Sequence, residues 1–155
     1  MGLRTKLRLY NAAVLTVLLY GGESWALTTA LVQRLETFHQ QCLRQILGTR
    51  YWQHISNVDI CARAGILPIR AILSQRRLLW LGEIGRMDSG RLVKRLLFSQ
   101  QDGTRPRAPP RTGLRRVFQR DVRALHGGHP NGQSWYSQCQ DTKEWRELVL
   151  AADLT

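Results

Sequence analysis

Apolar residues recur at helical spacing along most of the chain, and this spacing constrains the fold more than any other feature. Near the N-terminus they recur every three or four positions, at Leu3, Leu7, Tyr10, Val14 and Leu18. Residues at that spacing share one face of a helix, whereas a half-buried strand requires alternation. No segment alternates for long, so the sequence predicts an all-α fold without a sheet.

Capping residues predict where the helices begin and end. The first helix is expected over residues 3–20 and the second over 30–47, ending at Gly48, because glycine readily adopts the left-handed conformation that follows a helix. Ser56 begins a third, short helix in a capping-box-like sequence. Further helices are expected over 68–87, 91–98 and 114–126, and a last one contains Trp145, Leu148 and Val149. The apolar side of the second helix is expected to comprise Leu31, Leu35, Phe38, Cys42, Leu43 and Ile46.

Residues 99–113 interrupt the helical pattern. The segment SQQDGTRPRAPPRTG contains three prolines and two glycines, a composition typical of an extended linker. The sequence therefore predicts three parts, namely a helical domain over 3–98, a basic Pro/Arg linker over 99–113 and a C-terminal helical segment over 114–152.

Positive charge is concentrated in residues 63–123. This segment holds fifteen basic and four acidic residues, so its net charge is +11, against +12 for the whole chain. All but three of the chain's 23 basic residues are arginine, which stays charged, pairs bidentately with phosphate and stacks on bases. The charge predicts a nucleic-acid partner, RNA or DNA, and a solvated basic face is the alternative.

The candidate phosphate-binding residues are arginines of the predicted helices and of the linker. Proline stiffens the linker, so its arginines lose less conformational entropy when they bind. The ten candidates are Arg70, Arg76, Arg77, Arg105, Arg107, Arg111, Arg115, Arg116, Arg120 and Arg123. Tyr51 and Trp52 follow Arg50 and could stack on bases, but a lid over the core is the favoured interpretation of this aromatic pair.

Motifs for catalysis or metal binding are sparse. No two aspartates are adjacent, and no Walker loop, GxSxG or HExxH motif occurs, so no catalytic residue and no cofactor are predicted. Four side chains could be considered for zinc, but they do not form the two tight pairs typical of a structural site. They are His39, Cys42, His54 and Cys61.

Cysteine usage bears on the compartment. The three cysteines are odd in number and widely spaced, which disfavours a disulfide framework and favours a reducing location, nuclear or cytoplasmic. The apolar run over 12–20 is too short to span a bilayer, so no membrane partner is expected.

Six sequence blocks together resemble the C-terminal part of non-LTR (LINE-type) retrotransposon reverse transcriptases, in particular the RTE-like group. They cover nearly the whole chain and occur in the family's order. The blocks are TKLRLYNAAVLTVLLYGGESWAL (5–27), RLETFHQQCLRQILGTRYWQHISN (34–57), RRLLWLGEIGRM (76–87), GTRPRAPPR (103–111), RDVRAL (120–125) and DTKEWREL (141–148).

This resemblance implies a thumb-like helical bundle and a basic post-thumb segment that handle nucleic acid. The parent family is an RNA-directed DNA polymerase with an endonuclease, but the family's Tyr-x-Asp-Asp motif and its endonuclease lie upstream of this region. The resemblance therefore implies a non-catalytic fragment that holds template-primer or RNA. Trp80 matches the family's R-x-x-W-L-G-H block, and Glu83 replaces its histidine.

Two alternatives stay open at this point. The chain could be a helical interaction module, whose helix 3–20 would pack on a missing polymerase palm or on a second copy. Departures from the family pattern, such as Ala108 in place of glycine, also agree with a decayed relic that has no retained activity.

Overall fold

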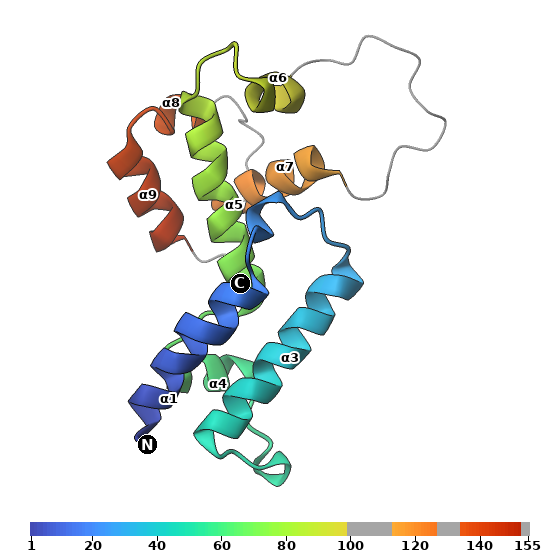
Figure 1. Ribbon diagram of the computed structural model, residues 1–155, viewed down its shortest axis with the longest axis vertical. Helices are drawn as coiled ribbons and strands as arrows, with labels where there is room; N and C mark the ends of the chain where they lie inside the picture. The colour runs from blue at the N-terminus through green and yellow to red at the C-terminus, as the bar shows by residue number, and fades with distance from the viewer. Residues whose placement is uncertain (99–112, 127–133, 153–155) are drawn as a thin grey trace. The chain divides into compact units, whose positions relative to one another are not determined.

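The computed structural model describes residues 1–98, 113–126 and 134–152. All regular secondary structure in these ranges is helical, which confirms the predicted all-α class (Figure 1). The predicted linker lies outside the described residues except for Gly113. The chain divides into two compact units. Unit 1 comprises Met1–Gly22 and Leu27–Leu73, and unit 2 comprises Glu23–Ala26 and Ser74–Leu154.

The first predicted helix is nearly continuous and contains one irregular turn. It consists of α1 (Leu3–Leu9), a π-helical turn η1 (Tyr10–Leu15) and α2 (Thr16–Leu18). The Thr16 hydroxyl donates to the carbonyl of Asn11, five residues earlier, at 3.1 Å. Gly21 follows the helix with a φ of +66°, a conformation that glycine adopts without strain.

The other helices of unit 1 begin and end where their capping residues predict. α3 (Thr29–Leu47) begins after Thr28, whose hydroxyl accepts from the backbone N–H of Leu31 at 3.3 Å. α4 (Asn57–Ala64) begins after Ser56, whose hydroxyl accepts from the N–H of Asp59 at 3.1 Å. Gly48 and Gly65 follow the two helices with φ of +69° and +62°. Unit 1 also contains a short 3-10 turn, η3 (Tyr51–Gln53), and another, η2 (Gly22–Ser24), begins at its last residue before Glu23.

The buried face of α3 differs from the predicted apolar stripe. Leu43 is fully buried as expected, but Leu31 and Phe38 are 44% and 43% exposed. His39 and Gln40 are buried in their place. The reason is that neighbouring elements supply hydrogen-bonding partners for these two polar side chains, which lowers the cost of burying them.

α5 (Ile69–Arg86) begins directly after Pro68 and crosses the boundary between the units at Leu73. Unit 2 also contains α6 (Leu92–Phe98), α7 (Leu114–Leu125), α8 (Ser134–Gln138) and α9 (Thr142–Ala151). All of these except α8 were expected from the sequence. None of the described helices is long and apolar enough to cross a membrane.

Two glycines of α5 admit the C-terminal segment into the core of unit 2. Trp145 of α9 is 1% exposed, and its indole N–H donates to the Leu78 carbonyl at 2.9 Å. A Cβ on Gly82 would lie 2.3 Å from that indole nitrogen, and one on Gly85 would lie 2.6 Å from Cys139 Sγ. α9 therefore packs directly against α5 (Figure 1).

These contacts explain why the compact units divide the chain within α5. The predicted division into a helical domain over 3–98, a linker over 99–113 and a C-terminal segment over 114–152 stays a prediction. The second half of α5 forms one core with α9, so the helical segment after the linker belongs to the same unit as the end of α5.

Candidate nucleic-acid interface

α7 separates a buried apolar side from an exposed basic side. Its buried residues recur at positions i, i+1, i+4 and i+5, which places them on one helical face. They are Val117, Phe118, Asp121 and Val122. The remaining surface carries four exposed arginines, which we call the α7 basic face. They are Arg115, Arg116, Arg120 and Arg123.

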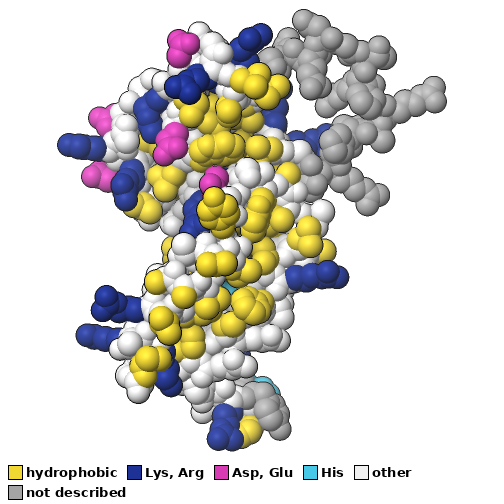
Figure 2. All heavy atoms as spheres, viewed as in Figure 1, with side chains coloured by type: hydrophobic (Ala, Val, Ile, Leu, Met, Phe, Trp, Pro, Cys, Tyr) yellow, Lys and Arg dark blue, Asp and Glu magenta, His cyan; other side chains and the backbone are white. Residues whose placement is uncertain are grey.

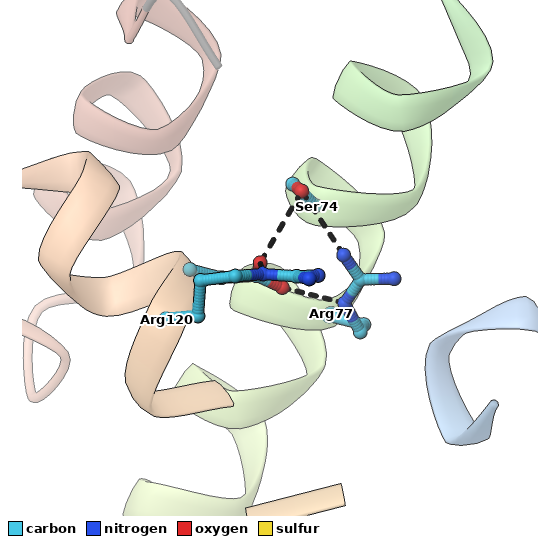
Figure 3. A network of polar contacts seen from close by, with 4 residues as sticks. Ser74, Arg77 and Arg120 are labelled. Carbon is cyan, nitrogen blue, oxygen red and sulfur yellow. Dashed lines mark hydrogen bonds and ion pairs between the residues drawn. The ribbon is translucent and has the colours of Figure 1, made fainter. Parts of the chain in front are cut away.

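A buried polar network holds α7 against α5 (Figure 3). Arg77 Nε of α5 lies 2.5 Å from Asp121 Oδ2 of α7, and both side chains are 3% exposed. The Ser74 hydroxyl donates to Asp121 Oδ1 at 3.4 Å and accepts from Arg77 Nη2 at 3.0 Å. The rings of Trp80 and Phe118 pack beside this network with their centroids 5.8 Å apart. The network and the rings together fix which side of α7 faces outward.

Little negative charge opposes the α7 basic face. Its one acidic residue, Asp121, is buried, and among the described residues its carboxylate pairs with only one surface arginine, Arg120. Arg116, Arg120 and Arg123 recur about once per helical turn, so they form a strip roughly 10 Å long at 1.5 Å per residue. Such a strip suits a row of phosphates.

Arg77 requires a correction among the predicted phosphate-binding residues. It is 2% exposed, and its guanidinium is used by Asp121 and Ser74, so a phosphate in solution cannot reach it. Arg70 is exposed but lies in unit 1, and Arg76 is half-buried in unit 2. The three linker candidates lie outside the described residues. They are Arg105, Arg107 and Arg111.

Two further basic side chains of residues 63–123 donate hydrogen bonds to backbone carbonyls of unit 2. Arg86 Nη1 donates to the Cys139 carbonyl at 2.7 Å. Lys94 Nζ donates to the carbonyls of Gly85 and Met87 at 2.8 and 2.7 Å, so it satisfies the C-terminal end of α5. Sequence counting alone could not separate these internal cations from the surface ones.

Trp52, one of the two aromatic residues after Arg50, does not cover the core. Trp52 is 54% exposed, and the Arg50 guanidinium lies 5.1 Å from the centroid of its ring. The lid interpretation is therefore wrong for Trp52. This residue belongs to unit 1, and the α7 basic face belongs to unit 2.

Two of the four side chains considered for zinc, His39 and Cys61, make other contacts. His39 Nδ1 lies 2.8 Å from the Tyr10 hydroxyl, and the Cys61 sulfur accepts from the Gln40 amide at 3.1 Å. His54 is exposed. Nowhere in the described ranges do three His, Cys, Asp or Glu side chains gather to hold a metal ion.

Comparison with known proteins shows a similarity to a protein of Caenorhabditis elegans. No family model matches the chain, and no solved structure matches it. Over 152 residues it is 22% identical to the transposon-derived protein F52C9.6 of Caenorhabditis elegans. The match covers 94% of this chain and 54% of that protein, so the chain spans about half the length of this relative.

Proposed function

We propose that this chain is a non-catalytic segment of a retrotransposon-derived protein that holds nucleic acid by contacts to phosphates. The observation that carries the proposal is the α7 basic face, four exposed arginines on one helix with no exposed carboxylate among them. Contacts of this kind bind the sugar-phosphate backbone and position it without selecting a base sequence. RNA or a paired template and primer are the expected ligands.

Two observations support the origin. The relative in Caenorhabditis elegans is transposon-derived, which supports a transposon origin for this chain. The six sequence blocks support the finer assignment to the thumb and post-thumb region of a LINE-type reverse transcriptase. The absence of adjacent aspartates from the sequence supports a role in holding nucleic acid and not in polymerising it.

A binding titration at two salt concentrations tests the proposal. The ligands are an RNA hairpin, a single strand and duplex DNA. If about five phosphates are contacted, log K falls with log salt at a slope of roughly −3.5 to −4.5. Binding that does not change with salt would reject phosphate contact, and no binding at all would favour a relic without retained activity.

Matched charge reversals locate the interface. Arg116, Arg120 and Arg123 are changed together to Glu, and a control changes the exposed Arg4, Lys6 and Arg8 of α1 to Glu. Both variants lower the net charge by the same amount. The α7 variant is expected to lose most of its affinity and the α1 variant to keep most of it. Equal losses would mean that only overall charge matters.

The first helical segment supports a second candidate function, a helical interaction module. Leu9, Val17 and Tyr20 are 57%, 73% and 83% exposed, and Figure 2 shows apolar side chains gathered over α1 and α3 in unit 1. Exposed apolar surface of this kind favours self-association. Light scattering tests this candidate, because Val17→Glu should restore a monomer if this face joins two copies.

A further inference from the structure

Arg120 differs from the other arginines of the α7 basic face because its guanidinium has a buried anchor. Its Nε lies 3.5 Å from Asp121 Oδ1, while its side chain is 62% exposed. Among the described residues, no carboxylate pairs with Arg115, Arg116 or Arg123. Of the four arginines, Arg120 therefore pairs with a buried carboxylate, and the other three have no such partner among the described residues.

The anchor itself is rigid. Asp121 is 2% exposed, and it is held by Arg77 and Ser74 of α5. A carboxylate fixed in this way restricts the positions that the Arg120 guanidinium can take. Since restricting a long side chain before binding reduces the entropy lost on binding, Arg120 begins closer to its bound geometry than its neighbours do.

The chemistry left over at Arg120 suits an anion with two oxygens. A guanidinium carries five N–H donors, and the atom of Arg120 that pairs with Asp121 is Nε, at 3.5 Å, so the Nη donors are left for an outside acceptor. No acceptor in the described part of the chain takes a hydrogen bond from them. Two guanidiniums share one carboxylate here, so the cluster keeps a net charge of +1 and still attracts an anion. A phosphodiester offers the paired oxygens that a guanidinium fork binds.

We infer that Arg120 is a preorganised phosphodiester-binding site of the α7 basic face, supported by Asp121, Arg77 and Ser74. The inference rests on the proposed function, because the phosphodiester is taken to be that of a nucleic-acid backbone. Arg120 binds one phosphate in a fixed, two-pronged geometry. Arg116 and Arg123 contribute attraction that depends on their charge and little on their shape.

Lysine substitutions separate shape from charge. Arg120→Lys, Arg116→Lys and Arg123→Lys each keep the positive charge and remove the planar fork. With the RNA hairpin, Arg120→Lys should weaken binding about tenfold, the loss expected when a charge-assisted hydrogen-bond pair is removed. The other two variants should weaken binding less than about twofold. The salt slope should stay unchanged in all three, because the number of neutralised phosphates does not change.

The outcomes distinguish this inference from the proposed function. If the unmodified chain does not bind the hairpin, the proposed function fails. If it binds and the three lysine variants behave alike, the α7 basic face stands and the special role of Arg120 is wrong. If the Arg120→Lys variant melts at a lower temperature than the parent chain, the Ser74→Ala variant is measured in its place. This change removes the Ser74 hydrogen bond to Asp121 without altering any charge. Ser74→Ala should weaken binding two- to threefold at an unchanged slope, and unaltered affinity would overturn the inference.

Discussion

The two units bury polar groups of different kinds. Unit 1 buries neutral groups, with His39 against Tyr10 and Gln40 against Cys61. Unit 2 buries an ion pair, Arg77 with Asp121. The two cores therefore respond to different disturbances. A neutral network is sensitive to protonation, whereas an ion pair is sensitive to loss of either partner.

The networks also differ in completeness. In unit 1, His39 Nε2 and Gln40 Oε1 have no hydrogen-bonding partner among the residues that the structure describes. In unit 2, both carboxylate oxygens of Asp121 have donors within 3.5 Å. The complete network is the one that positions the α7 basic face. The incomplete one fills the space between the first helical segment, α3 and α4.

Removal of the Asp121 carboxylate should destabilise the protein more than any other change considered below. Asp121→Ala leaves the buried Arg77 charge without a partner, which should cost about 3–5 kcal/mol of unfolding free energy. Urea denaturation followed by circular dichroism measures the loss. A change below about 1 kcal/mol would show that water reaches the network and that the contrast between the units is false.

A paired variant provides the control for this experiment. The double substitution Arg77→Met with Asp121→Leu replaces both charged side chains by apolar side chains of similar size. Because neither charge is then left buried alone, the double variant should be close to the parent chain in stability. A double variant as unstable as Asp121→Ala would mean that the shape of the site matters more than its charge balance.

Acidification should destabilise unit 1 through His39. Burial lowers the pKa of His39 below its ordinary 6.5, although the charge of Glu36 acts in the opposite direction. Burial also raises the pKa of Tyr10, and Cys42 raises it further, so the phenol stays protonated, and its oxygen lies 2.8 Å from Nδ1 of His39. The folded chain therefore binds fewer protons at His39 than the unfolded chain does.

The sign and the pH range follow from this shift. The contribution of His39 is fully present above pH 6.5 and declines as pH falls through the lowered pKa, by at most about 1.4 kcal/mol per pH unit. Urea denaturation at pH 7, 6 and 5 measures it, with His39→Gln as the control whose stability should depend less on pH. Parallel pH profiles for the two chains would contradict the prediction.

Much of the fold was predictable because the signals are local. Thr28 and Ser56 begin helices, and Gly48 and Gly65 end them, by backbone geometry that involves only neighbouring residues. The buried face of α3 was not predictable in the same way. Whether His39 or Phe38 is buried depends on Tyr10, which is 29 residues away in the sequence.

The candidate site was predictable to a similar extent. The arginines of α7 lie between apolar residues at helical spacing, so the sequence indicates that they face outward. Arg77 has similar neighbours, and only the position of Asp121, 44 residues later, shows that its charge is used internally. One signal was present in the sequence, because Asp121 is the only acid among the arginines of this helix.

The smallest expected effect is that of Gln40→Met. Gln40 is 6% exposed, and its amide nitrogen donates to the Cys61 sulfur and to Glu36 Oε1. Its amide oxygen has no hydrogen-bonding partner within the described part of the chain. Methionine has a similar shape and removes an unsatisfied acceptor together with two modest hydrogen bonds, so the unfolding free energy should change by less than about 1 kcal/mol. Urea denaturation beside Asp121→Ala gives the comparison. A loss of several kcal/mol would mean that the neutral network contributes as much to stability as the ion pair does. The two cores would then differ in their chemistry but not in their contribution to stability.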